Sequence, residues 1–154
     1  MNEEAQAISI RPARETDAST IVHLVQLLAS DLGEQSPVDS DYVLDFMKTP
    51  GTGILVGDLA GEVIGLITCT LRPSLYHAGD SCMIEELVVR EDFRSAGIGG
   101  MLLEAIVSLA ADKGCPEVSL SVMSFNTKAI EFYRRHGFVD EAVLLEKHLH
   151  SVDH

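Results

Sequence analysis

Apolar positions in the first third of the chain follow two different periods, and each predicts a different element. Residues 7–13 alternate apolar and polar side chains, as a half-buried strand does. Residues 21–28 carry apolar side chains at helical spacing. A polar stretch over residues 33–41 then leads to a short apolar segment over 42–47, which a Pro-Gly pair ends. This part of the chain therefore predicts a strand followed by two helices.

The middle of the chain predicts a meander of strands and then a helix. Residues 54–57 and 63–69 are rich in β-branched and apolar side chains, and Ala60-Gly61-Glu62 between them is typical of a hairpin turn. A further strand is predicted over residues 83–89. Apolar side chains at helical spacing over residues 101–110 predict the next helix, which a glycine stops.

The last third predicts a strand, a helix and one or two terminal strands. Residues 118–123 alternate apolar and polar side chains, and the following helix is predicted from Thr127 to His136. Residues 138–150 supply the terminal strands. The predicted order is βαα-βββ-α-β-α-ββ, without an internal repeat, and the length fits one domain over residues 1–154.

Charge narrows the class of partner. The formal net charge is −13, which repels polyanions, and no basic cluster offsets it, so we expect no nucleic-acid partner. A cationic partner fits this balance better. Surface carboxylates that only keep the protein soluble are an equally good explanation of the charge.

Cysteine usage and hydropathy predict the compartment. Cys69, Cys82 and Cys115 are odd in number and far apart, with no Cys-x-x-Cys spacing, which favours a reduced, cytoplasmic compartment and small buried thiols. The N-terminus has no pattern of a secretory signal, and no run approaches the roughly 18 apolar residues of a membrane span. We therefore expect a soluble, unsecreted protein with no membrane partner.

Glycines cluster where the strand over residues 83–89 gives way to a helix. The first amides of a helix have no intrahelical acceptor and form a site for phosphate oxygens, which Gly97, Gly99 and Gly100 leave unobstructed. Arg94 adds a positive charge and Ser95 a hydroxyl. The same glycines are also typical of tight turns and close packing, and the segment is neither a Walker A loop nor a complete dinucleotide fingerprint.

Two segments in order along the chain resemble the signatures of the GNAT family of N-acetyltransferases. Residues 86–103, with Arg94-Ser95-Ala96-Gly97-Ile98-Gly99 at their centre, are similar to its acetyl-CoA signature, in which Arg/Gln-x-x-Gly-x-Gly/Ala follows a strand. Residues 126–138, which begin at Asn126, resemble its second signature. The resemblance covers nearly the whole chain. It implies an α/β (α+β) fold with a central mixed, mostly antiparallel sheet of six to seven strands and about four flanking helices.

The resemblance also implies a set of cofactor-binding residues and no metal. Backbone groups of one strand would contact pantetheine, the loop amides would bind the pyrophosphate, and an asparagine would face the thioester arm. Glu91 replaces a family-typical proline and Ser95 a frequent glycine, so we expect altered loop detail. The implied acetyl-CoA-binding residues are Leu87, Val88, Val89, Arg94, Ser95, Ala96, Gly97, Ile98, Gly99, Gly100 and Asn126.

Three side chains are candidates for the chemistry of acetyl transfer. By resemblance, Tyr133 is the general acid near the CoA sulfur, although it could instead be an aromatic anchor. Glu85 and Glu86 form an acidic pair like that of polyamine and other small-amine acetyltransferases. Strand alternation points the two to opposite faces, so only one of them easily faces the amine. By resemblance, Glu85 is favoured as the base through water, and Glu86 could instead bind the ammonium. A bulge would reverse that assignment, and two merely solvated carboxylates are the alternative.

These features predict direct transfer of acetyl from acetyl-CoA to a primary amine, in a small cationic or polyamine-like acceptor. One alternative is a protein or peptide N-terminal acetyltransferase, although Ser121 stands where such enzymes typically carry a glutamate. Another is a non-catalytic acetyl-CoA sensor. Tyr76 and His77 are loop candidates for substrate contact. Because family members often pair two subunits, the resemblance also makes a homodimer through the last strands an expectation.

Overall fold

The computed structural model describes residues 7–150, which fall into two structural units divided after Leu120. The first unit holds five strands and three of the α-helices. The second holds one, α4 (Thr127–Arg135). Because the chain divides in this way, the single domain predicted over residues 1–154 stays a prediction.

The first unit is built on a five-stranded sheet in the order β1-β2-β3-β4-β5. Neighbours from β1 to β4 pair antiparallel, and β5 pairs parallel with β4. This confirms the α+β class with a mixed, mostly antiparallel sheet. The strands are β1 (Ile8–Pro12), β2 (Thr52–Leu59), β3 (Glu62–Ser74), β4 (Gly79–Val89) and β5 (Val118–Leu120).

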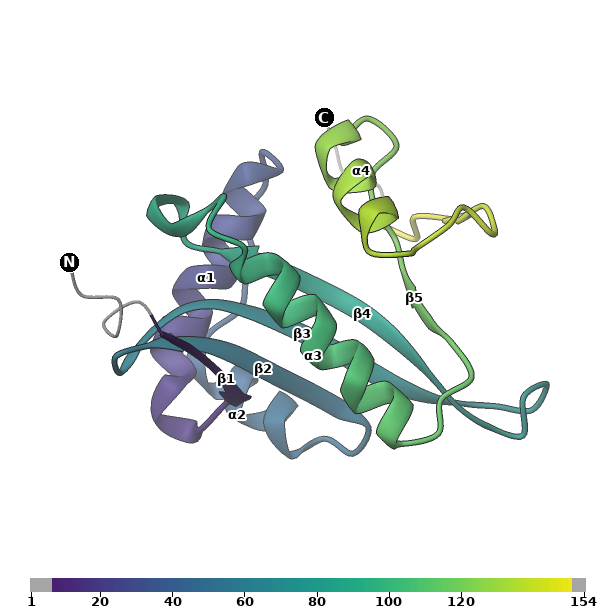
Figure 1. Cartoon of the computed structure of the whole chain (residues 1–154), viewed down its shortest axis with the longest axis horizontal. Helices are drawn as coiled ribbons and strands as arrows, with labels where there is room; N and C mark the ends of the chain where they lie inside the picture. The colour runs from purple at the N-terminus through teal and green to yellow at the C-terminus, as the bar shows by residue number, and fades with distance from the viewer. Residues whose placement is uncertain (1–6, 151–154) are drawn as a thin grey trace. The chain divides into compact units, whose positions relative to one another are not determined.

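Helices cover both faces of this sheet (Figure 1). The helices α1 (Ala18–Asp31) and α2 (Ser40–Lys48) pack on one face, and α3 (Ile98–Asp112) crosses the other. Neighbouring positions of β3 face the two layers. Leu66 is fully buried in the core cluster with residues of α1 and α2, whereas a Cβ on Gly65 would meet Leu102 of α3 at 3.3 Å. With α4, the described chain has four α-helices, as predicted.

The terminal strands predicted over residues 138–150 are wrong. Residues 138–150 are described by the structure and contain no strand. The strand predicted over 118–123 is also shorter, and only the three residues of β5 form it. A strand exists only through a hydrogen-bonded ladder with a neighbour, and no strand in the described chain pairs with residues 138–150. The sheet therefore has five strands rather than six or seven.

Candidate active site

A β-bulge interrupts β4 at the acidic pair. Along the ladder with β3, Glu86 lies opposite Thr68, but Ile84 already lies opposite the next residue of β3, Cys69. Glu85 is therefore an extra residue with no partner of its own. Such a bulge bends the strand and re-aims the side chains beside it.

Both carboxylates of the pair reach hydroxyls on the same face of β3. The Thr68 hydroxyl donates a hydrogen bond to the Glu86 carboxylate and accepts one from the Glu86 N–H at 3.0 Å. The Thr70 hydroxyl donates to Oε2 of Glu85 at 3.1 Å. Since Thr68 and Thr70 are two positions apart on one strand, they share a face. The prediction that Glu85 and Glu86 point to opposite faces is wrong, and the bulge is the reason.

Burial distinguishes the two carboxylates. Glu85 is exposed, whereas Glu86 is half-buried beside the fully enclosed Thr68. Burial raises the pKa of Glu86, and the negative charge of Glu85 raises it slightly further, while the hydrogen bond from Thr68 lowers it; burial prevails. A carboxyl with a raised pKa is a stronger base once ionised.

Glu86 and Thr68 open into a cavity of about 470 Å³ between the sheet and helices α1 and α2. Eight of its twelve lining residues are apolar or aromatic. The remaining four are two acids and two hydroxyl residues. The lining consists of Ile21, Val25, Ser36, Pro37, Val38, Asp39, Tyr42, Val43, Phe46, Ile54, Thr68 and Glu86.

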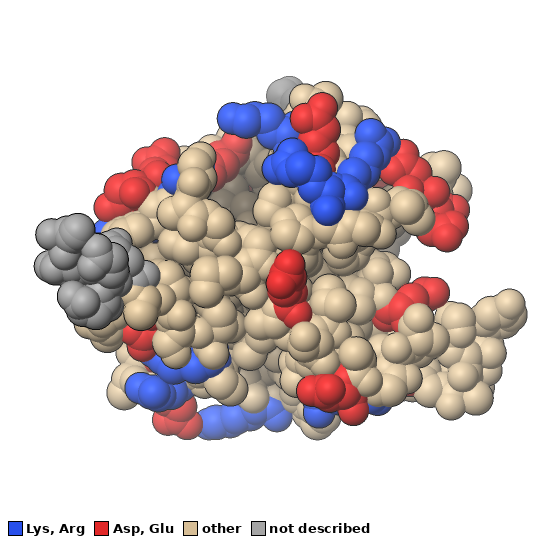
Figure 2. Space-filling model, viewed as in Figure 1, with Lys and Arg blue, Asp and Glu red and all other residues tan. Residues whose placement is uncertain are grey.

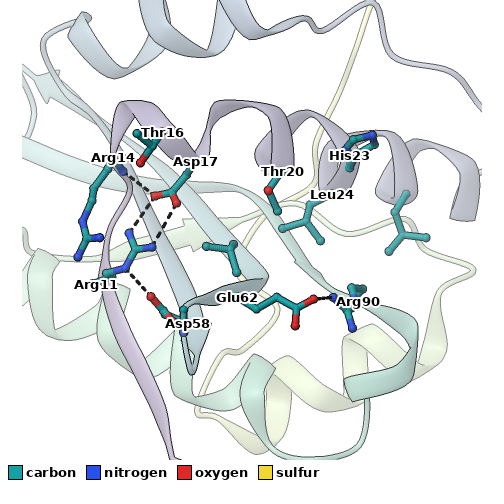
Figure 3. A pocket seen from close by; sticks show the side chains of 13 residues that line it. Arg11, Arg14, Thr16, Asp17, Thr20, His23, Leu24, Asp58, Glu62 and Arg90 are labelled. Carbon is teal, nitrogen blue, oxygen red and sulfur yellow. Dashed lines mark hydrogen bonds and ion pairs between the residues drawn. The ribbon is translucent and has the colours of Figure 1, made fainter.

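A larger cavity of about 620 Å³ lies beside α1, but its principal charges are already paired (Figure 3). Arg11 donates to Asp17 at 2.8 and 3.2 Å and to Asp58 at 3.0 Å. Asp17 also accepts the backbone N–H of Arg14 at 2.7 Å. The bonds from Arg11 hold the pKa values of Asp17 and Asp58 below their usual range. This network ties β1 and β2 to the start of α1, and we assign it a structural role.

The predicted phosphate-binding loop has the geometry of an amide cradle. Gly97 adopts a left-handed conformation, with φ of 84°, and caps the N-terminus of α3. The first helical bond runs from the Met101 N–H to the Gly97 carbonyl at 3.1 Å, so the amides of Ile98, Gly99 and Gly100 have no acceptor within the helix. A Cβ on Gly97 would meet nothing within 4 Å, which leaves open space beside the turn. These residues fit a pyrophosphate.

Arg94 joins the glycine loop to its neighbours in the first unit. The Arg94 guanidinium donates to Asp31 at 2.9 Å and to the Val89 carbonyl at 2.8 Å, so it joins the loop to the end of α1; its contact with pyrophosphate stays a prediction.

The ladder between β4 and β5 covers only Cys82 to Ile84. Among the described strands, none pairs with this edge of β4 beyond Ile84. Apart from the Val89 carbonyl, which Arg94 holds, the backbone groups that residues 87–89 direct to this edge are available to an extended ligand such as pantetheine.

The second unit carries the other two predicted site residues on α4. Asn126 caps the helix, with its Oδ1 accepting the Ala129 N–H at 3.2 Å. Tyr133 packs edge-on against Phe132 and Phe138, with ring centroids 5.2 and 5.9 Å away. Burial raises the pKa of Tyr133, which keeps the phenol protonated at neutral pH. Figure 2 shows Lys and Arg side chains gathered over this helix.

Several other predictions concern residues outside these sites. Tyr76 is almost fully exposed at the β3–β4 turn, and His77 Nε2 lies 3.7 Å from Oε1 of Glu117. Burial raises the thiol pKa of Cys69, and that of Cys82 to about 12, which suits small core residues rather than nucleophiles. Within residues 7–150, no three His, Cys, Asp or Glu side chains are placed to hold a metal ion, and no helix is long and apolar enough to cross a membrane.

Sequence reasoning missed Thr68 and Thr70, as well as the apolar cavity. One signal was available. Two threonines separated by one residue in an otherwise apolar strand place two hydroxyls on one face, which calls for polar partners on the next strand.

Comparison with known proteins relates this arrangement to an enzyme family. The model of the acetyltransferase (GNAT) family matches residues 21–138. A thialysine N-epsilon-acetyltransferase of Bos taurus is 28% identical over 146 residues, 86% of this chain and 85% of that protein. An N-alpha-acetyltransferase of Sulfolobus acidocaldarius is 29% identical over 143 residues, 86% and 81% of the two chains. The crystal structure of an aminoglycoside acetyltransferase from an uncultured soil metagenomic sample has the same fold, with a TM-score of 0.82, 21% identity, and 94% and 97% of the chains covered.

Proposed function

Because the chain belongs to the GNAT family and is therefore an acetyl-CoA-dependent N-acetyltransferase, we propose that its acceptor is the primary amine of a small cationic molecule bound at Glu86. The observation that carries this proposal is a carboxylate of raised pKa that lines a mainly apolar cavity. Acetyl-CoA supplies the acetyl group on an activated thioester when it is bound. The chain's own residues bind the amine and move its protons.

Glu86 is the proposed base, acting directly or through a water molecule. An ammonium group at the cavity pairs with its carboxylate, and the same carboxylate then accepts the proton that the amine must lose before it can attack. The Thr68 hydroxyl donates to the Glu86 carboxylate and accepts the Glu86 backbone N–H, and these two bonds hold the side chain in place. Glu86 thus takes the role that the resemblance favoured for Glu85, which is the reversal expected of a bulge. Glu85 adds negative charge next to it, which attracts a cation.

Tyr133 is the proposed general acid, which gives a proton to the leaving sulfur. A tyrosine phenol is protonated at neutral pH, as a proton donor must be, and burial of Tyr133 keeps it so; the support for the role is its place in the second family signature. The amides of residues 98–100, the edge of β4 at Leu87, Val88 and Val89, and Asn126 are the proposed acetyl-CoA contacts. Their support is the open cradle at Gly97 and the unpaired strand edge.

A peptide N-terminus is the second candidate acceptor. The Sulfolobus acidocaldarius relative, named an N-alpha-acetyltransferase, favours it at nearly the same identity as the bovine protein. The size of the cavity favours the small amine. A cavity of about 470 Å³ lies in the range of small-molecule pockets.

The test is release of free CoA with a panel of small amines and short peptides, followed by Tyr133→Phe. We expect release matched one to one by an acetylated small amine. Tyr133→Phe should lower kcat about 100-fold, the usual contribution of a general acid, with an unchanged Kd for acetyl-CoA.

Other results would replace the proposal. Binding of acetyl-CoA without turnover on any amine would favour the sensor. Turnover on peptides alone would favour the N-terminal acetyltransferase, and full activity of Tyr133→Phe when chemistry limits the rate would remove the proposed acid.

A further inference from the structure

The cavity beside Glu86 contains a charge pattern that restricts the acceptor further. We propose that the acceptor is a primary amine on an apolar arm without a carboxylate, and that amino acids are excluded. This inference rests on the proposed function and narrows its substrate class.

The apolar part of the lining fits a hydrocarbon arm. Ile21 and Val25 come from α1, Val43 and Phe46 from α2, and Ile54 from β2, so three elements surround the same space. Transfer of each methylene from water to such a surface is favourable. A chain of a few methylenes therefore supplies binding energy that does not depend on polar contacts.

The charged part of the lining has one sign. Glu86 and Asp39 are acids, and none of the twelve lining residues is Lys, Arg or His. A carboxylate on the acceptor would lose hydration, find no cation in the lining and be repelled by Glu86. A second ammonium group is tolerated, because Asp39, the N-cap of α2, lines the same cavity with a carboxylate whose Oδ1 accepts the Tyr42 N–H at 2.8 Å.

The contrast with the other cavity makes the missing cation significant. Beside α1, Arg11 compensates Asp17 and Asp58 directly. At Glu86, the partners are a threonine hydroxyl and a neighbouring carboxylate. The fold thus leaves the negative charge of Glu86 to be met by the acceptor, which must be cationic there and must bring no anion with it.

Three matched amines test this inference: pentylamine, 1,5-diaminopentane and lysine. Lysine is 1,5-diaminopentane with one added carboxylate. We expect kcat/KM for lysine to be at least tenfold below that for 1,5-diaminopentane, and pentylamine to be a substrate as well. Thialysine, the compound in the name of the bovine relative, is also an amino acid, and we expect its kcat/KM to be as low as that of lysine.

The outcomes separate this inference from the proposed function. If lysine or thialysine matches 1,5-diaminopentane, the exclusion of carboxylates is wrong while the small-amine acetyltransferase stands. If acetyl-CoA binds and no amine reacts, the proposed function fails and this inference fails with it.

A charge introduced into the lining provides an independent test. Val38→Arg places a cation at the edge of the cavity, where Val38 is half-buried. It should raise the ratio of kcat/KM for lysine to that for 1,5-diaminopentane at least fivefold. Val38→Met, of similar length without charge, should change both substrates equally. Thermal unfolding verifies that both variants fold, and an unchanged ratio in folded Val38→Arg overturns the proposal.

Discussion

Two cavities are lined by residues of α1, and they differ in whether their carboxylates are paired with a cation. In the larger one, Arg11 is hydrogen-bonded to Asp17 and Asp58, and both carboxylates have lowered pKa values. In the smaller one, no Lys, Arg or His of the lining within residues 7–150 faces Glu86, and its pKa is raised. Paired charges stabilise a fold, whereas a carboxylate whose charge is left uncompensated retains the capacity to bind a cation and take its proton. Charge compensation, rather than cavity volume, is therefore the basis on which we assign the larger cavity a structural role and propose a catalytic role for the smaller one.

The largest expected effect on stability comes from breaking the compensated cluster. Arg11→Met leaves Asp17 nearly enclosed without its cation, and we expect it to lower the free energy of unfolding by about 3 kcal/mol. Denaturant unfolding at pH 7 measures this loss. Asp17→Asn in the same background should recover part of it, because it removes the unpaired charge. A loss below about 0.5 kcal/mol would mean that the cluster behaves as an ordinary surface ion pair.

The same variant has a defined pH dependence. Since Arg11 lowers the pKa values of Asp17 and Asp58 in the folded state, its stabilisation is complete above their unfolded pKa of about 3.9 and is lost as pH falls through the folded values. Because the unfolded states titrate alike, the difference in unfolding free energy between wild type and Arg11→Met should be largest near pH 7 and should shrink as pH falls, since the enclosed carboxylates are protonated first in the variant. A difference that grows in acid would contradict the assignment.

A smaller effect is expected from removing the hydroxyl that holds Glu86. Thr68→Val has nearly the same shape but donates no hydrogen bond to the carboxylate, so the pKa of Glu86 should rise further. We expect kcat/KM for the amine to fall about tenfold at pH 7, and the acid limb of the profile to move to higher pH. Thr70→Val, the matched change beside the exposed Glu85, should cost less than twofold. An acid limb that stays in place in Thr68→Val would separate Thr68 from the ionisation that limits the rate.

The smallest effect concerns the stability contribution of Glu86 itself, and its sign is opposite to that of the Arg11 cluster. A raised folded pKa means that ionisation disfavours the folded state above the unfolded pKa of Glu, about 4.3. Glu86→Gln should therefore raise the melting temperature slightly at pH 7, with no gain below about pH 4, where the carboxyl is protonated in both states. A lower melting temperature at pH 7 would mean that the ionised carboxylate is compensated after all.

Local sequence patterns predicted most elements of the first unit correctly. The strand and two helices at the start, the hairpin of β2 and β3, and the glycine turn before α3 each depend on residues close together in the chain. The left-handed Gly97 and the free amides after it follow from the same short segment. Such features are visible in one sequence because the interactions that determine them are local.

The features that the sequence did not reveal depend on distant segments. The bulge at Glu85 depends on the register between β3 and β4, where Thr68 meets Glu86 eighteen positions away. A single extra residue changes which side chains share a face, so alternation alone misplaced the acidic pair. Residues 138–150 had a strand-like pattern without a strand to pair with. The cavity depends on how α1 and α2 pack over β2 and β3, which no local pattern records.

Kinetics of Glu86→Gln and Glu85→Gln test the central claim most directly. With a small amine as the acceptor, the proposed base predicts that Glu86→Gln lowers kcat/KM by about 100-fold or more, while Glu85→Gln lowers it by less than tenfold. The Kd for acetyl-CoA should be the same in both variants and in wild type. If Glu86→Gln keeps wild-type kcat/KM, or if Glu85→Gln has the larger effect, the assignment of Glu86 as the base is contradicted.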